Sequence, residues 1–319
     1  MRSNMKTRLL LHLLLAIFCF NSQPVAANSW RDAIEQAELT SGQYYQAASR
    51  AGYGAGYLGT FMNELGISEH TCSILGRMLG KEETTTELEF IEKPDLGGSI
   101  TNDNFYDYLI AARLFENWAS TAIRMLELSE SEKVSVWNLS CVGSFEISED
   151  HYIGEVSTTF VVDDNELRVL GDIESGFYEE LVSVLSKNPD IDEVLLGSGG
   201  GSVSDAIRSG RLLRQRQIST SLYSDCLSAC PLVFLGGSPR RIIWSPYPRL
   251  GFHQVSRGGQ PVQTNNPIYT LIAEYVDSMG ANPRFVMSWV FEASIYDMHY
   301  PNVSALCQYG VTTWVQRAC

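Results

Sequence analysis

The stretch Val194-Leu-Leu-Gly-Ser-Gly-Gly-Gly-Ser-Val203 decides the fold of this chain. Its apolar start predicts a buried strand, and its three consecutive glycines predict a tight turn. A helix is expected to follow as far as about Gln215, capped by Ser202 or Ser204. Backbone N–H groups at such a turn can point outward and hold an anion. A phosphate loop and a dinucleotide fingerprint do not fit, because no Gly-Lys-Ser/Thr follows and the glycines are contiguous.

Short β-rich runs around this motif predict a mixed α/β domain. The segment from Gly176 to Ser186 has one apolar helical face and lies between two of these runs. A strand, a helix and a second strand in that order build a parallel sheet. The expected strands are Val134–Cys141, Thr158–Val162, Leu167–Leu170, Val194–Leu196 and Ile218–Leu222.

The chain before this domain has the pattern of helices. Apolar residues at three- and four-residue spacing predict helices over Trp30–Ala48, Tyr57–Leu65 and Asn104–Leu128. The polar stretch Lys81–Asn104 predicts a loop, and His70 is interpreted as a surface or packing residue. We therefore expect a mainly helical region over residues 28–132 and an α/β domain over residues 133–319.

The N-terminus has the features of a secretory signal. Arg2, Lys6 and Arg8 precede the apolar run Leu9–Phe20, and small residues end at Ala27. This pattern predicts a signal peptide over residues 1–27 and an exported, periplasmic protein. The apolar run is shorter than the roughly 20 residues of a membrane helix, so an uncleaved anchor is the alternative. No later stretch is apolar enough to span a bilayer, so no membrane span is expected after cleavage.

Charge argues against one class of partner. Cleavage after Ala27 would leave 20 basic and 37 acidic residues, a net charge of −17. An acidic surface repels phosphate backbones, and the sequence has no basic stripe with interleaved aromatic residues. Nucleic acid is therefore not expected as a partner.

Six of the seven cysteines lie beyond the predicted signal. An even number of cysteines in an exported chain predicts disulfides, although six cysteines allow fifteen pairings. No spacing typical of zinc ligands occurs, so neither a metal nor a cofactor is expected. The six are Cys72, Cys141, Cys226, Cys230, Cys307 and Cys319.

Two residues beyond the glycine turn are candidates for chemistry. Ser228 lies in Cys226-Leu-Ser-Ala-Cys230, at the expected start of a helix, where N–H groups favour an oxyanion. His253 ends the apolar piece Arg249–His253 and could take a proton from a serine and return it to a leaving group. A glycine turn, a serine and a histidine in this order are the parts of acyl-transfer chemistry.

The segment from Leu167 to about Trp314 resembles the ClpP/crotonase superfamily, and within it the exported ClpP-like proteins. Three motifs carry the resemblance: Ser198-Gly-Gly-Gly-Ser-Val203, the small and apolar run from Ser228 to Gly237, and His253-Gln254. The resemblance implies an α/β fold built as a spiral of β-β-α units, preceded here by the mainly helical region.

The resemblance also implies roles for individual residues. Ser228 would be the nucleophile and His253 the general base. The N–H groups of Gly200 or Gly201 and of Ala229 would form the oxyanion hole. The third catalytic residue would be Asp297, which precedes Tyr309-Gly310 and would hold the tautomer of His253; capping a helix is its alternative role. As a departure from the family's pattern, Cys226 and Cys230 flank the serine, and a disulfide from one of them, for example to Cys307, would fix the serine helix or restrict access to it.

These roles predict an exported serine hydrolase, a peptidase that acts on peptide or protein substrates and assembles as a homo-oligomer. The alternative is a catalytically inactive ClpP-like protein that binds or scaffolds. Acyl-CoA chemistry does not suit an exported chain, and an oxidising compartment disfavours a cysteine nucleophile. A lysine-dependent site resembling signal peptide peptidase A is not expected, because the only lysine after Lys133 is Lys187, which lies on the wrong element.

Overall fold

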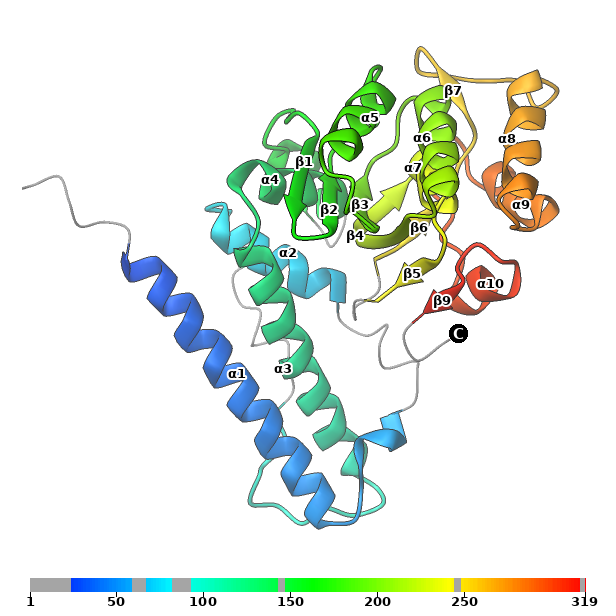
Figure 1. The fold of residues 1–319 in the computed structure, drawn as a ribbon. Coiled ribbons are helices and arrows are strands. Elements are labelled where there is room, and N and C mark those ends of the chain that lie inside the picture. The colour runs from blue at the N-terminus through cyan, green and yellow to red at the C-terminus, as the bar shows by residue number, and fades with distance from the viewer. Residues whose placement is uncertain (1–23, 59–66, 82–92, 143–146, 244–247, 316–318) are drawn as a thin grey trace, which may run out of the picture.

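The computed structural model describes residues 24–58, 67–81, 93–142, 147–243, 248–315 and 319. It contains a helical region followed by an α/β part (Figure 1). The predicted signal peptide lies mostly outside the described residues, and residues 24–27 form the first turn of helix α1. None of the described helices is both long and apolar enough to cross a membrane.

The helical region is built on two long helices that run side by side in opposite directions (Figure 1). These are α1 (Pro24–Arg50) and α3 (Phe105–Leu126), and both overlap the predicted helices. The Ser41 hydroxyl donates to the Ala112 carbonyl, and the rings of Trp30 and Trp118 stack between them. A short 3₁₀ turn covers Ala55–Leu58, at the start of the helix predicted over Tyr57–Leu65. The remainder of that predicted helix lies outside the described residues.

Helix α2 (Ile67–Met78) and helix α4 (Glu130–Ser140) complete the region. The strand predicted over Val134–Cys141 is wrong, because Ser129 and Glu132 form a capping box that starts a helix there. The helix buries Val136 and Trp137. The predicted boundary after residue 132 falls inside α4, so the helical region continues to Ser140.

A seven-stranded sheet forms the α/β part. Strand β1 pairs with β2 antiparallel, and every other pairing within this sheet is parallel. The predicted strands after residue 158 are confirmed. Along the sheet the order is β1 (Thr159–Asp163), β2 (Glu166–Leu170), β3 (Glu193–Ser198), β4 (Ser219–Leu227), β5 (Arg240–Ile242) and β9 (Trp314–Val315), while β6 (Leu250–Gly251) pairs with the end of β4.

Helices connect the parallel strands, as the strand–helix–strand pattern predicts. Their apolar faces pack on the sheet in a core shared with the later helices. The connecting helices are α5 (Phe177–Lys187), α6 (Val203–Arg216) and α7 (Cys230–Leu235). Next come the hairpin β7 (Ser256–Arg257) and β8 (Gln260–Pro261) and the helices α8 (Pro267–Ser278), α9 (Pro283–Glu292) and α10 (Val303–Gln308).

The helical region packs against the sheet. Leu170, Leu195 and Tyr223 of the sheet belong to the same apolar cluster as the helices. The Tyr223 hydroxyl donates to the Arg124 carbonyl, at 2.9 Å. A nearly buried ion pair joins Arg168 of β2 to the capping residue Glu132, with 2.8 Å between Nε and Oε1. The sheet therefore lies between two apolar cores: one face packs against the helical region, and the other packs against the connecting and later helices.

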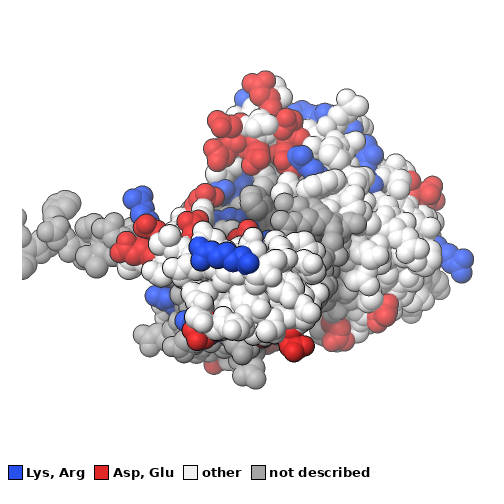
Figure 2. Space-filling model, turned by 90° about the horizontal axis from the view of Figure 1, so that it is seen from below, with Lys and Arg blue, Asp and Glu red and all other residues white. Residues whose placement is uncertain are grey.

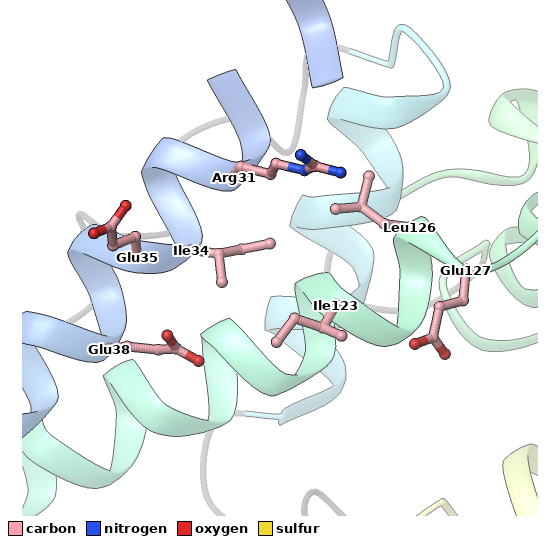
Figure 3. Close-up of a pocket in the computed structure, with 7 residues that line it drawn as sticks. All are labelled: Arg31, Ile34, Glu35, Glu38, Ile123, Leu126 and Glu127. Carbon is pink, nitrogen blue, oxygen red and sulfur yellow. The ribbon is translucent and has the colours of Figure 1, made fainter. Parts of the chain in front are cut away.

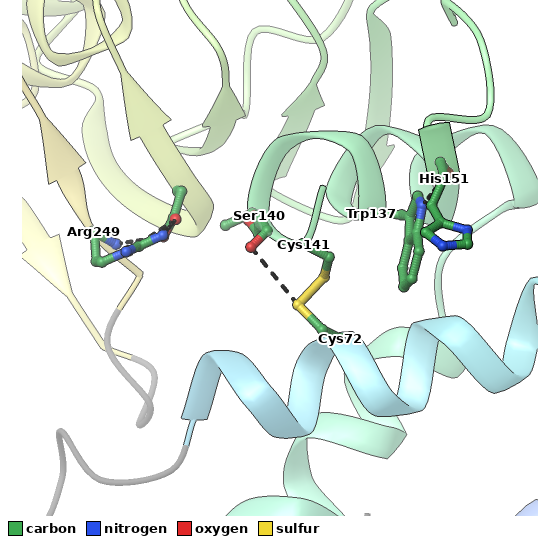
Figure 4. The surroundings of a disulfide bond; sticks show 8 residues. Cys72, Trp137, Ser140, Cys141, His151 and Arg249 are labelled. Carbon is green, nitrogen blue, oxygen red and sulfur yellow. Dashed lines mark hydrogen bonds and ion pairs between the residues drawn. A yellow bond between two sulfur atoms is a disulfide. The ribbon is translucent and has the colours of Figure 1, made fainter. Parts of the chain in front are cut away.

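The six cysteines predicted to form disulfides do so in three pairs: Cys72–Cys141, Cys226–Cys230 and Cys307–Cys319. Cys72–Cys141 ties α2 to the end of α4 (Figure 4).

In Figure 2, Lys and Arg are scattered on the face shown rather than gathered into one band.

Candidate active site

Ser228 lies on a sharp turn between a strand and a helix. Strand β4 ends at Leu227 and helix α7 begins at Cys230. The φ angle of Ser228 is 60°, in the left-handed region that residues other than glycine rarely adopt. Its N–H donates to the Gly251 carbonyl of β6, at 2.9 Å. Strained serines on such turns are typical of nucleophiles, because the turn exposes the hydroxyl at the edge of the sheet.

A disulfide brackets this turn. Cys226 is the second-last residue of β4, Cys230 is the first residue of α7, and both are fully buried. The bridge fixes the two ends of the segment that carries Ser228. The expected example of a bridge to Cys307 is wrong, because Cys307 pairs with Cys319.

The glycine turn packs directly against the Ser228 turn. A Cβ atom on Gly200 would lie 2.5 Å from the Ser228 Cβ and 2.8 Å from the Ala229 nitrogen. The φ angles of Gly200 and Gly201 are 103° and 129°. No side chain fits at Gly200 without moving the serine, so the three glycines serve this close approach as well as the turn.

The N–H groups of the turn differ in what they bind. The Gly200 N–H donates to the Ser198 Oγ, at 3.1 Å. Within the described residues, no acceptor is bonded to the N–H of Gly201 or of Ala229. Of the two glycines predicted for an oxyanion hole, Gly201 therefore has the free donor. Sequence reasoning missed the part played by Ser198, although this serine opens the glycine motif.

Ser228 and His253 line one small pocket, together with Gly201 and Ala229. Its volume is about 70 Å³. The rest of the wall is mostly apolar and comes from α6, α7, α8, α9 and the segment after β6: Val203, Pro231, Leu232, Phe252, Val255, Ser256, Ile272, Val286 and Val290. The structure thus brings together the predicted serine, the predicted histidine and the two residues whose N–H groups are free.

His253 follows Phe252, whose backbone pairs with that of His299. Burial lowers the pKa of the His253 imidazole below its usual range, and the Ser294 backbone partly offsets this effect. Burial thus favours the neutral imidazole, which is the form that accepts a proton. Its Nδ1 atom is buried and has no hydrogen-bond partner in the described part of the chain.

Asp297 is exposed and its carboxylate accepts a hydrogen bond from the Ser294 Oγ, at 2.8 Å. No hydrogen bond joins Asp297 to His253 among the residues that the structure describes. The predicted direct contact between these two side chains is therefore not formed here. Ser294 connects the two residues: its hydroxyl donates a hydrogen bond to Asp297, and its backbone interacts with His253.

Neighbouring ionisable groups have structural contacts of their own. His299 Nδ1 lies 3.3 Å from a Glu292 carboxylate oxygen, and its ring stacks on Trp289. Across the described ranges, no three His, Cys, Asp or Glu side chains gather in a way that could hold a metal ion. Serine and histidine are thus the groups that this pocket offers for chemistry.

No protein-family model and no curated protein matches the chain. Among solved structures, it is similar to a mutant of the 1510-N membrane-bound stomatin-specific protease, at 16% identity over 48% of this chain and 77% of that one. It is also similar to a ClpP1 mutant from Listeria monocytogenes, at 16% identity over 47% and 90% of the two chains. A third is the ClpP protease catalytic domain from Plasmodium falciparum, at 18% identity over 47% and 84%. The TM-score is 0.37 in each case.

Proposed function

We propose that this chain is an exported serine hydrolase that cleaves peptide bonds, with Ser228 as nucleophile and His253 as general base. One observation carries the proposal. Ser228 sits on a strained turn that opens onto the same pocket as His253 and the two free N–H groups of Gly201 and Ala229.

The chemistry follows from these positions. The Ser228 Oγ attacks the carbonyl carbon of the substrate while His253 accepts the hydroxyl proton. The N–H groups of Gly201 and Ala229 stabilise the negative charge on the carbonyl oxygen. His253 then returns the proton to the leaving amine, and water hydrolyses the acyl-enzyme by the same steps in reverse order.

Asp297 would act on His253 through Ser294 rather than directly. Its carboxylate holds the Ser294 hydroxyl, and the Ser294 backbone favours the protonated imidazole. Asp297 is then a positioning residue. Asp297→Asn would lower kcat with little change in KM and move the lower limb of the pH–rate profile.

Three disulfides support the proposed export, because such bonds persist in oxidising compartments such as the periplasm. Assembly as a homo-oligomer remains part of the proposal. It rests on the sequence resemblance, and light scattering that gave a monomer would contradict it.

Labelling with a fluorophosphonate probe, followed by peptide mass mapping, tests the proposed activity. We expect modification at Ser228, which Ser228→Ala and His253→Ala both abolish. Ser256→Ala is the matched control, because Ser256 lines the same pocket and has no proposed role. If the folded wild-type protein is not labelled, or is labelled equally in Ser228→Ala, Ser228 is not the nucleophile.

A second candidate is a binding protein without activity. It is favoured by the unpartnered Nδ1 of His253, and by the lack of a hydrogen bond between the side chains of Ser228 and His253 among the described residues. Such a protein would bind peptides equally well as wild type and as Ser228→Ala, and neither form would react with the probe.

A further inference from the structure

A groove with a volume of about 420 Å³ runs between α1 and α3 in the helical region (Figure 3). Its apolar lining consists of Ile34 from α1 and of Ile123 and Leu126 from α3. Ile34 is buried, whereas Ile123 and Leu126 are 40% and 38% exposed. Two large aliphatic side chains three residues apart thus lie next to each other on one helix face without cover.

Acidic side chains border this apolar strip. Glu35 and Glu38 come from α1 and Glu127 follows the last residue of α3, and Figure 3 shows them around the isoleucines. In the described chain, none of the three carboxylates forms an ion pair. Among the described residues that line the groove, Arg31 is the only basic one. The groove therefore has an excess of negative charge around an apolar floor.

An apolar floor with acidic sides indicates which kind of molecule the groove can bind. An apolar face that rests on the isoleucines and the leucine, with lysines or arginines along its sides, would satisfy both features. A second copy of this chain is a poor match, because the protein has 37 acidic and 23 basic residues. An anionic lipid surface is repelled for the same reason.

The walls of the groove also select a helix as the occupant. Both walls are helices whose backbone groups bond within each helix, so the groove offers side chains and no strand edge. A third helix can pack its ridge of side chains between two antiparallel helices. We propose that the groove between α1 and α3 is a docking site for a basic amphipathic helix of a partner protein.

Fluorescence anisotropy with a labelled synthetic helix tests this proposal on the full chain. The probe is a 14-residue peptide with leucines on one helical face and lysines on the other. We expect the triple variant Glu35→Gln, Glu38→Gln, Glu127→Gln to bind about ten-fold more weakly, because three exposed charge pairs are lost. The variant Ile123→Asn, Leu126→Asn should lose a similar amount, and its binding should no longer depend on the leucine face of the probe.

A matched variant separates docking from general charge attraction. Glu149→Gln, Glu180→Gln, Glu274→Gln removes three exposed carboxylates that lie away from the groove. We expect its affinity to fall by less than about two-fold. Circular dichroism shows whether each variant keeps the helical content of the wild type, and a variant that loses it is replaced by the corresponding single substitutions.

Three results would overturn the proposal. The first is an equal loss of affinity in both triple variants, which indicates non-specific attraction. The second is a dimer, seen by light scattering, that only the groove variants dissociate; the occupant is then a second copy. The third is competition by a peptide of residues 1–20 of this chain at a concentration equal to that of the probe, which identifies the protein's own N-terminus as the occupant.

Discussion

Glycines have different roles in the helical region and in the α/β part. A Cβ atom at Gly42 or Gly80 of the helical region would meet no other atom within 4 Å. In the α/β part, a Cβ at Gly236 would lie 2.2 Å from the Gly210 carbonyl oxygen, and one at Gly237 would lie 2.7 Å from the Thr220 backbone nitrogen. At these positions, backbones of the α/β part lie in direct contact, whereas the two glycines of the helical region face open space.

Removing a disulfide should therefore destabilise the helical region more than it destabilises the α/β part. Replacing Cys72 and Cys141 together by serine frees a loop of about 70 residues, which costs about 4 kcal/mol of unfolding free energy by loop entropy. Replacing Cys226 and Cys230 opens a much shorter loop and costs about 2 kcal/mol. Urea denaturation of both double variants measures the two losses. Equal losses would remove this difference between the regions.

Backbone contact in the α/β part predicts the next largest effect. Gly236→Ala would push α7 away from Gly210 of α6, and we expect a loss of about 3 kcal/mol. Gly42→Ala, inside α1, is the matched change and should stabilise the protein by up to about 1 kcal/mol, because alanine favours a helix. Thermal or urea unfolding checks both. A loss of stability in Gly42→Ala would show that the helical region is also packed through its backbone.

Buried histidines should give the two regions different responses to pH. Burial lowers the pKa of His70 in the helical region to about 4. The unfolded chain binds a proton near pH 6.5 and the folded chain does not, so stability falls as the pH falls through this range. Between pH 7.5 and pH 5 the wild type should lose about 2 kcal/mol more than His70→Gln.

Urea denaturation at the two pH values measures this loss. The proposed peptidase activity should follow His253 instead, and fall at a pH below the usual histidine range, because burial lowers the pKa of this proposed base. If His70→Gln has the same pH dependence as the wild type, His70 is not the group responsible.

Sequence predicted the sheet better than the helices. All six residues of β3 are buried, so a continuous apolar run was a sufficient signal. Helix α2 was missed because polar residues such as Ser68, Glu69 and Thr71 interrupt its apolar pattern. Helix α4 was taken for a strand because its alternating Val134 and Val136 resemble one, and the deciding capping box lies before them.

The candidate site was predictable in its residues but not in its bonds. Ser228, His253 and the glycine turn were found from their order along the chain, and the structure places them at one pocket. Which glycine N–H is free depends on the rotamer of Ser198, and the partner of Asp297 depends on a turn that begins at Ser294. These contacts arise between segments, so local sequence does not specify them.

The bridge between Cys226 and Cys230 also bears on the order of oxidative folding. Its sulfurs are four residues apart in sequence, whereas those of Cys72 and Cys141 are 69 apart. The probability that two ends of a chain meet falls with the length between them. We expect the short bridge to close first when the chain meets an oxidant. The turn that carries the serine would then be formed before the helical region packs against the sheet.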